Sequence, residues 1–292
     1  MENLILVTGH RGFVGGHLTN YLDQQGIKWV GYDLVDGFDI RDKFKLESTF
    51  MEHPIDVVIH LAALASPIKS MMFPDEYVDT NIKGTQNLLE CAKRYKIKRF
   101  ISFSSSSVYG DQAPPNSEKE PYMPTSIYGI TKTTSELLVK ASDVPYTIIR
   151  PFTLYGLNGR KDQVIYKWIN FLKQKKPITI LGDGTTKRGY TYINDLVKAV
   201  VDLIDNKKAE NETFNLGGTE VVTIEELAKL FQDTIKCEID WKPEIQYAPL
   251  LKGDVYANYA DISKAKELIG YDPPQNFRKN IENIIKHELC ET

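Results

Sequence analysis

The stretch VTGHRGFVG, residues 7–15, decides the fold of this chain. The apolar residues 4–7 lead into it and are typical of a buried parallel strand. Apolar side chains then recur at helical spacing over residues 14–22. The glycines therefore lie on a turn from a strand into a helix, which is the context that makes a glycine pattern informative.

Each of the three glycines in this turn has its own physical role. Gly9 permits the tight turn, Gly12 lets the backbone approach a pyrophosphate, and Gly15 allows the helix to pack closely on the strand. The free N–H groups and the positive dipole end of the helix then attract phosphates. The alternative is a glycine-rich turn that binds nothing. The strand-to-helix context favours a dinucleotide site instead.

Composition places the chain among ordinary globular proteins. Its 292 residues are 42% hydrophobic and 26% charged, which suits one large α/β domain or two closely packed ones. The formal charge of −3 gives no reason to expect a nucleic acid or an anionic membrane as a partner. Any site for an anion must therefore be local.

The chain carries no signal for a membrane, for export or for a metal. No apolar run approaches the roughly 20 residues that span a bilayer. Glu2 and Asn3 leave the N-terminus without the basic region of a signal peptide. Cys91, Cys237 and Cys290 are widely spaced and do not match a metal site. We therefore expect reduced thiols, no metal, no membrane partner and a cytoplasmic location.

An acidic residue ends the second predicted strand, residues 29–33. This residue, Asp33, comes 18 residues after Gly15, where a carboxylate binds the two ribose hydroxyls of an adenosine and repels a 2′-phosphate. Asp33 therefore favours NAD over NADP. Arg11 favours NADP, because a guanidinium inside the glycine turn can hold a 2′-phosphate. We give Asp33 the greater weight.

Polar and small residues follow the next predicted strands. Leu61, Ala62 and Ala63 continue from strand 56–60 and suit either close passage of a ligand or plain packing. Four serines, residues 104–107, follow strand 100–103. Such a run usually forms a loop, but at the C-terminal edge of a parallel strand it is also placed to hydrogen-bond a substrate.

Tyr128 and Lys132 are four residues apart, so they share one face of a helix that Ser126 can cap. A tyrosine and a lysine at this spacing often form a surface pair by chance. Their position after the serine run makes a role in the site more plausible than the spacing alone would.

The alternation of strands and helices loosens after about residue 155. We expect an α/β protein with a Rossmann-type, doubly wound parallel sheet over residues 1–155. Residues 156–292 are expected to form mainly a smaller substrate-binding lobe, with segments that return to the main sheet, and the ligand cleft should lie between the two. Three more local predictions are one helix over residues 74–95, a strand over residues 190–193 and a loop over residues 243–254.

Several motifs occur together along the chain: Thr8-Gly9-x-x-Gly12-Phe13-Val14-Gly15, Asp33, Asp39-Ile40, His60-Leu61-Ala62-Ala63, Asn81-x-x-Gly84-Thr85, Ser105, Val108-Tyr109-Gly110, Tyr128-x-x-x-Lys132, Gly182-Asp183-Gly184-x-x-x-Arg188 and Gly253-Asp254. With them the chain resembles the extended short-chain dehydrogenase/reductases, specifically their sugar-nucleotide epimerase/dehydratase group. The resemblance covers nearly the whole chain.

The resemblance implies three catalytic residues, Ser105, Tyr128 and Lys132. It implies NAD as the cofactor, held by Gly9, Gly12, Phe13, Val14, Gly15, Asp33, Asp39, Ile40, Leu61, Ala62, Ala63, Asn81, Tyr128, Lys132 and Phe152. It implies a nucleotide sugar as the substrate, bound by Ser105, Ser106, Thr153, Arg188 and Asp254. It also implies a homodimer in which the helices that carry Asn81 and Tyr128 pair with their copies.

The chain departs from the family pattern at several places. Family dehydratases carry Asp-Glu after the catalytic hydroxyl residue, because loss of water needs a further acid and base. Ser106 and Ser107 stand there instead, and the Glu that family decarboxylases usually keep is also missing. Thr153 replaces an Asn of many epimerases, and Leu251 replaces an Arg that contacts the diphosphate. Epimerisation and simple keto reduction are the reactions that remain.

We therefore expect an NAD-dependent nucleotide-sugar 4-epimerase, most plausibly for a UDP-sugar. Tyr128 takes the proton of the 4-hydroxyl group, Ser105 binds the same oxygen, and Lys132 favours the phenolate. Arg188 is expected to hold the diphosphate. One alternative is a 4-keto-sugar reductase that consumes NAD(P)H and shares these residues. The other is a non-catalytic dinucleotide-binding regulatory protein.

Overall fold

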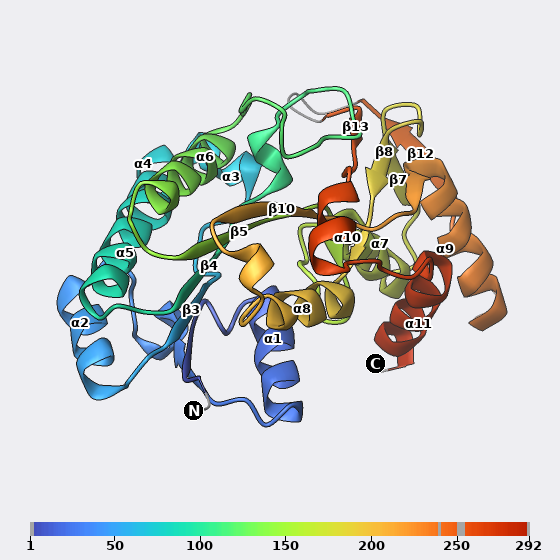
Figure 1. Ribbon diagram of the computed structural model, residues 1–292. Coiled ribbons are helices and arrows are strands. Elements are labelled where there is room, and N and C mark those ends of the chain that lie inside the picture. Colours follow the sequence, from blue (N-terminus) through green and yellow to red (C-terminus); the bar gives the residue numbers. More distant parts are fainter. Residues whose placement is uncertain (1–2, 239–240, 250–254, 291–292) are drawn as a thin grey trace.

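The structure is a computed structural model that describes residues 3–238, 241–249 and 255–290, and a six-stranded parallel sheet lies at its centre (Figure 1). The strands are β1 Ile5–Thr8, β2 Trp29–Tyr32, β3 Val57–His60, β4 Arg99–Phe103, β5 Tyr146–Pro151 and β10 Glu212–Leu216. Their order across the sheet is β10-β5-β4-β3-β1-β2. From β1, the next strand is added on one side and the later strands on the other, so the strand order reverses between β1 and β3. Sheets of this kind open a crevice for a ligand at that point.

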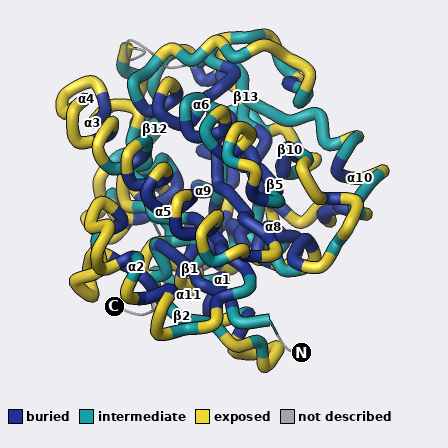
Figure 2. Tube along the Cα trace, turned by 60° about the vertical axis from the view of Figure 1, so that its left-hand side comes forward, coloured by how far each residue is buried: buried dark blue, intermediate teal, exposed yellow. Residues whose placement is uncertain are grey.

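Helices cover both faces of the sheet because alternate side chains of each strand point to opposite faces. Ile5 and Val7 join the apolar cluster that packs with α1 Phe13–Gln24 and α8 Ile193–Asp202, whereas Leu6 joins a cluster on the other face. That second face is covered by α2 Lys43–Glu52, α5 Gly84–Arg94 and α6 Ile127–Lys140. Strands β1, β3 and β4 are fully buried, whereas the edge strand β2 is mostly half-buried; Figure 2 shows the buried centre in dark blue. The predicted doubly wound α/β sheet is confirmed.

The helix predicted over residues 74–95 is continuous but not regular. It starts as α4 Pro74–Tyr77, passes through a π-helical turn, η2 Val78–Lys83, and continues as α5. The π turn contains the buried Asn81, whose side chain bonds the backbone of Leu64. A π turn of this kind often marks a functional site. The short helix α3 Pro67–Met72 comes just before α4 in the chain.

The remaining elements lie mostly in the second half of the chain. They are β6 Leu154–Tyr155, α7 Val164–Lys173, β7 Ile178–Leu181, β8 Lys187–Gly189, β9 Thr191–Tyr192, β11 Val221–Thr223, α9 Ile224–Glu238, β12 Ile245–Ala248, β13 Ala257–Asn258, α10 Ser263–Ile269 and α11 Phe277–Cys290, with short 3-10 turns η1 Leu34–Asp36, η3 Ser106–Val108 and η4 Lys207–Ala209. Helices α7, α9 and α11 share an apolar cluster of their own around Trp168, Phe231 and Ile281. Strand β10 and helix α8 return to the main sheet, so this half contributes to two cores. The boundary near residue 155 stays a proposal.

Two local predictions in this half are only partly right. The strand predicted over residues 190–193 is only β9, because Ile193 begins α8 and shares its buried face with Leu196 and Val200. The loop predicted over residues 243–254 contains β12, which pairs in parallel with β7 although two of its four residues are exposed. Pairing with a neighbour far along the chain decides this strand, and its own sequence carries little apolar signal. Within the described residues, no helix combines the length and apolarity needed to cross a membrane.

Candidate active site

The glycine turn closes tightly on itself and on the end of β3. Gly9 has a φ of +74°, and a Cβ atom there would lie 2.6 Å from the backbone nitrogen of Ala62. A Cβ atom at Gly15 would overlap the carbonyl oxygen of Gly9. At Gly12, the N-cap of α1, an added Cβ would meet only that carbonyl oxygen, at 3.2 Å. Packing therefore requires two of the glycines, and the third leaves the helix N-terminus open to a phosphate.

Two cavities meet at this turn and form one trough along the C-terminal ends of the strands. Their volumes are about 540 and 300 Å³, and Gly9, Gly12, Leu61 and Ala63 line both. A dinucleotide has two halves joined by a pyrophosphate, so it needs two connected cavities with a phosphate cradle between them. The residues present therefore fit a dinucleotide cofactor.

The trough brings together most of the residues predicted for the site. The smaller cavity is lined by Asp33, Asp39, Ile40 and Ala62, and the larger one by Phe13, Val14, Gly15, Ser105, Ser106, Tyr128, Lys132, Phe152 and Thr153. Asn81 and Arg188 do not line these two cavities. Asp254 lies outside the described residues.

Asp33 follows β2 directly and is buried at the wall of the smaller cavity. Its Oδ2 accepts a hydrogen bond from the backbone N–H of Arg11 at 3.0 Å, and its Oδ1 accepts one from Val35 at 3.0 Å. Each carboxylate oxygen can accept a further bond, so the side chain is held in place and can still bind ribose hydroxyls.

Asn81 braces the loop after β3. Its side-chain oxygen accepts from the Leu64 N–H at 2.8 Å, and its amide nitrogen donates to the Leu64 carbonyl and to the Thr131 hydroxyl, both at 3.0 Å. The residue is 1% exposed. It thereby joins the loop that lines the trough to α6, the helix of Tyr128 and Lys132, and its direct contact with a cofactor stays a prediction.

Tyr128 and Lys132 both lie on the buried face of α6, as their spacing predicts. Ser126 caps this helix, because its hydroxyl accepts the N–H of Gly129 at 3.1 Å. The Lys132 Nζ donates to the carbonyl oxygen of Phe103, the last residue of β4, at 2.7 Å. This bond ties the catalytic helix to the strand that leads into the serine run.

Ser105 comes two residues after β4 and faces the same cavity as Tyr128. Its hydroxyl oxygen accepts the N–H of Ser107 at 3.1 Å and lies at the same distance from the Ser107 hydroxyl. Ser106 receives a hydrogen bond from the Asn258 side chain at 3.1 Å, which leaves its own O–H free to donate. The serine run is therefore a set of oriented hydroxyl groups.

The electrostatics of the phenol differ from the sequence-based expectation. Burial raises the pKa of Tyr128, and the Ser105 hydroxyl and the Arg160 guanidinium oppose that rise. Burial also lowers the pKa of Lys132, to about 8, against the opposing charge of Glu136. Arg160 is therefore a cation that favours the phenolate and that the sequence-based expectation did not name. The role expected of Lys132 stays a prediction.

Arg160 was not predicted from the sequence. It lines the larger cavity with Tyr128, and its Nη1 donates to the Ala65 carbonyl at 2.8 Å. Its Nε and Nη2 bind the carboxylate of Asp162 at 3.0 and 2.6 Å. An Arg between two predicted elements carries no periodic signal, so sequence spacing could not have identified it.

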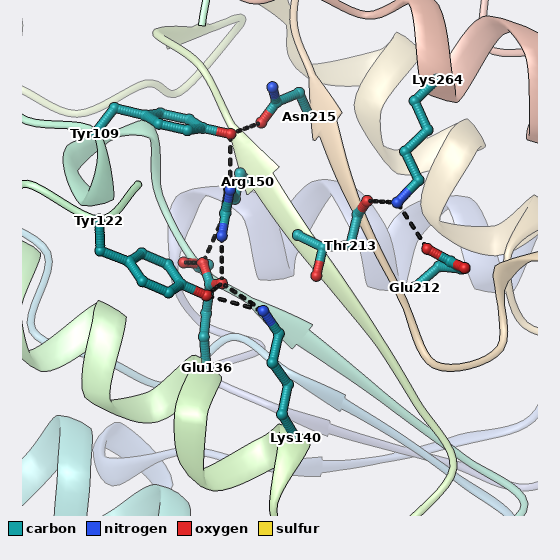
Figure 3. Close-up of polar contacts among 10 residues, drawn as sticks. Tyr109, Tyr122, Glu136, Lys140, Arg150, Glu212, Thr213, Asn215 and Lys264 are labelled. Carbon is teal, nitrogen blue, oxygen red and sulfur yellow. Dashed lines mark hydrogen bonds and ion pairs between the residues drawn. The ribbon is translucent and has the colours of Figure 1, made fainter. Parts of the chain in front are cut away.

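A buried ion pair supports the catalytic elements from behind (Figure 3). Arg150 of β5 donates from Nε and Nη2 to the two carboxylate oxygens of Glu136 on α6, at 2.9 and 2.7 Å. Glu136 also accepts hydrogen bonds from the hydroxyls of Ser104 and Tyr122. The arginine bonds outweigh the effect of burial and hold the pKa of Glu136 below its usual range.

The network continues to the edge of the sheet. Arg150 Nη1 donates to the Tyr109 hydroxyl at 2.8 Å, which donates to the Asn215 side chain on β10 at 2.7 Å (Figure 3). Because Ser104 precedes Ser105 in the chain, the network fixes both the serine run and α6. The sequence offered one sign of this network: Glu136 comes four residues after Lys132 and therefore lies on the same face of α6.

A third cavity, of about 470 Å³, holds Arg188 together with Trp168 and Tyr190. Thr153, Leu154 and Gln163 line both this cavity and the larger one of the trough. The predicted substrate cleft therefore reaches from the sheet into the second half of the chain. Arg188 Nη1 donates to the carbonyl of Lys187 at 2.8 Å. Its contact with a diphosphate stays a prediction.

The fold and this trough define a Rossmann-type enzyme that combines a dinucleotide cradle with a Ser, Tyr and Lys site. A model of the NAD-dependent epimerase/dehydratase family matches residues 5–217. The chain belongs to this family, which is of the extended short-chain dehydrogenase/reductase type.

Individual relatives agree over nearly the full length of the chain. A UDP-glucuronate 4-epimerase of Thermodesulfobacterium geofontis is 33% identical, with 96% of this chain and 94% of the relative covered. The structure of a Bacillus cereus UDP-glucuronic acid 4-epimerase in complex with UDP-glucuronic acid and NAD is similar, with 31% identity, coverage of 97% and 99%, and a TM-score of 0.86. The structure of a Thermotoga maritima UDP-glucose 4-epimerase is also similar, with 29% identity, 99% coverage of both chains and a TM-score of 0.90.

Proposed function

We propose that this chain is an NAD-dependent 4-epimerase of a UDP-sugar that works through a transient 4-keto sugar. The observation that carries the proposal is the continuity of the cleft. A dinucleotide cradle, the Ser105, Tyr128 and Lys132 groups and the cavity with Arg188 follow one another through shared lining residues. Relatives named as UDP-sugar 4-epimerases support the same reaction.

The side chains of the larger cavity supply the proton chemistry. Tyr128 takes the proton of the sugar 4-hydroxyl group, and Ser105 binds the same oxygen and orients it. Ser105 and Arg160 oppose the effect of burial on the pKa of Tyr128, so both favour the phenolate. The glycine turn and Asp33 would hold NAD, which would supply the acceptor and donor of the C4 hydride. Tyr128 gives its proton back as the hydroxyl re-forms.

The lining of the larger cavity argues against dehydration. Among the described residues that line it, none is Asp or Glu. Ser106 and Ser107 occupy the positions where family dehydratases carry an acid and a base. Removal of water needs a second acid–base group, whereas epimerisation at C4 needs only one.

The same lining favours a sugar that carries a carboxylate. Arg160 is a cation at the sugar end of the trough, and the hydroxyls of Ser106 and Thr153 face the same space. Arg160 uses three of its five N–H donors on Asp162 and Ala65, so two stay available for a sugar carboxylate. Hydroxyl donors also bind a carboxylate, and no acidic side chain lines the described wall of this cavity. We therefore propose UDP-glucuronic acid as the substrate, in line with the names of two relatives.

The test is incubation of the purified protein with UDP-glucuronic acid, UDP-glucose and UDP-N-acetylglucosamine, with NAD but no reductant. We expect the C4 isomer of the acidic sugar to form fastest, with no net change in NADH. A 4-keto uronic acid is a β-keto acid that readily loses CO₂, so the assay should also follow UDP-pentose. Formation of no C4 isomer from any of the sugars overturns the proposal.

The two alternatives have distinct outcomes in the same assay. A 4-keto-sugar reductase yields no isomer in this assay, but it consumes one NADH or NADPH for each sugar reduced when a nucleotide 4-keto sugar and the reduced cofactor are added. A regulatory protein binds the dinucleotide and turns over none of the sugars. The well-formed cluster of Ser105, Tyr128 and Lys132 in one cavity favours catalysis over this last reading.

A further inference from the structure

Arg11 lies in the glycine turn at the wall of the smaller cavity, and the structure gives its side chain a partner. The guanidinium binds the carboxylate of Asp36 through Nε, at 3.2 and 3.1 Å, and through Nη2, at 3.0 Å. His10 Nε2 also lies 3.0 Å from Asp36 Oδ2. The cation that could hold a 2′-phosphate is thus already occupied by an acid of this chain.

One short turn places both carboxylates around Arg11. Asp33 caps the 3-10 turn η1 by accepting the N–H of Val35, and Gly37 ends the turn with a φ of +84°. Asp36 is the last residue of η1. Asp33 therefore accepts the backbone N–H of Arg11 while Asp36 binds its side chain. The arginine is held at both ends by residues only three positions apart.

The local charge then opposes a 2′-phosphate. Arg11 brings one positive charge, and Asp33 and Asp36 bring two negative charges. The cavity lining also includes Arg41 and Asp39, which bind each other at 2.6 Å and add no net charge. A phosphate monoester carries about −1.5 to −2 at neutral pH. If Arg11 left Asp36 to bind it, an unpaired carboxylate would lie close to the phosphate. If Arg11 bound it while still paired, the phosphate would lie close to the Asp36 carboxylate itself. Ribose hydroxyls carry no charge and meet no such obstacle.

We propose that Asp36 is a specificity-determining residue that selects NAD over NADP by sequestering Arg11. This inference rests on the proposed function for the identity of the cofactor, and its test needs no turnover. Asp33 binds the ribose hydroxyls, and Asp36 withholds the guanidinium that would otherwise hold a 2′-phosphate. Removal of Asp36 therefore uncovers the NADP-binding ability that the glycine turn already contains.

A purely structural role for the pair makes a different prediction. If Asp36 only clamps η1 onto the glycine turn, its loss should weaken both dinucleotides to a similar extent. The pair is partly exposed, with 58% of the Arg11 side chain and 29% of that of Asp36 accessible. Exposed ion pairs contribute little to stability, so the Asp36→Asn variant should fold.

The experiment measures binding of NAD⁺ and NADP⁺ by titration calorimetry, without any sugar. In Asp36→Asn we expect NADP⁺ to bind about tenfold more tightly or better, the scale of a gained charge-assisted hydrogen bond, and NAD⁺ to bind within about twofold of the wild type. Arg11→Ala in the same background should abolish the gain. Arg11→Ala alone should leave NAD⁺ binding nearly unchanged.

A matched control removes a comparable charge elsewhere. Glu47 pairs with Arg94 on the outer helices and lines neither cavity, so Glu47→Gln should change neither dinucleotide. An unchanged affinity of Asp36→Asn for NADP⁺, or equal weakening of both dinucleotides, overturns the inference while wild-type NAD⁺ binding still stands. Failure of the wild type to bind NAD⁺ is the separate result that defeats the proposed function itself and removes the basis of this inference.

Discussion

Arg150 donates two hydrogen bonds to Glu136, at 2.9 and 2.7 Å, in a part of the core where neither side chain is more than 2% exposed. Burying two charges is costly, and the cost is offset only when the geometry is good and the remaining polar atoms are satisfied. Glu136 meets that condition because Ser104 and Tyr122 also bind its carboxylate. The pair connects β5 to the helix that carries Tyr128.

Breaking this pair should be strongly destabilising. Glu136→Gln leaves the Arg150 guanidinium buried without a counter-charge, which should lower the free energy of unfolding by about 3–5 kcal/mol. Urea denaturation followed by circular dichroism measures the change. In the control Glu90→Gln, which removes a surface pair with Lys43, we expect a loss of about 0–1 kcal/mol. Equal losses in the two variants would contradict the role given to the buried pair.

Among substitutions of the predicted catalytic residues, Tyr128→Phe should reduce turnover the most. It removes the proposed base but keeps the ring, so we expect a loss of about 10²-fold or more with little change in the melting temperature. Ser105→Ala should retain more activity because the base stays. Ser104 already donates to Glu136 and cannot replace the lost hydroxyl, whereas Ser106 keeps an O–H that could do so in part. Near wild-type turnover of a folded Tyr128→Phe protein would remove the proposed mechanism.

Lys132 should make stability depend on pH in the alkaline range. Burial lowers its pKa to about 8 from the ordinary 10.5. Between these values the unfolded chain binds the proton and the folded chain does not, so stability rises with pH across the window from about 8 to 10.5. Lys132→Met should lack this rise. The measurement is urea denaturation of both proteins from pH 7 to pH 10, compared as a difference because buried tyrosines titrate in both. A constant difference across this range contradicts the prediction.

Arg160 should discriminate among sugars. If it faces the sugar carboxylate, Arg160→Gln should raise KM for UDP-glucuronic acid by about tenfold or more and change KM for UDP-glucose much less, because only the first loses a charge-assisted hydrogen bond. Since Arg160 also favours the phenolate form of Tyr128, its loss should raise the pKa of this base and shift the rising, acidic limb of the kcat profile to higher pH. Steady-state kinetics on both sugars, from pH 6 to pH 10, measures both effects. An equal change in KM for both sugars would count against the carboxylate contact.

The proposed homodimer can be tested through exposed apolar residues on two neighbouring helices. Ile130 and Leu137 lie seven residues apart on α6 and are 46% and 51% exposed, and Val78 of η2 is 44% exposed. Pairing of these helices with their copies would bury this surface. Ile130→Lys with Leu137→Lys should give a monomer in sedimentation experiments at micromolar concentration. Phe44→Lys, on the outer face of α2, serves as the control and should leave the dimer intact. A wild-type monomer would refute the proposal.

The sequence by itself determined the features that depend on near neighbours in the chain. The glycine turn, the capped helix with Tyr128 and Lys132, and the placement of Asp33 after its strand all follow from spacings within one or two elements. Hydrophobic runs also predicted strands such as β1 and β3, because strands buried on both faces are largely apolar. Glycine at residue 9 could be assigned a tight turn because only a residue without a Cβ atom fits there.

Only the tertiary structure decided which charges meet. From the sequence, Arg11 favours binding of NADP. In the structure it binds Asp36, 25 residues away, and this pairing removes the reason to expect a contact with a 2′-phosphate. Arg160 reaches the loop at Ala65 across 95 positions, so nothing in its local pattern places it beside Tyr128. Charged side chains have long reach and no periodicity, and their partners are set by how the elements pack. The chemistry of this site therefore follows from local sequence, while its electrostatic tuning follows from the fold.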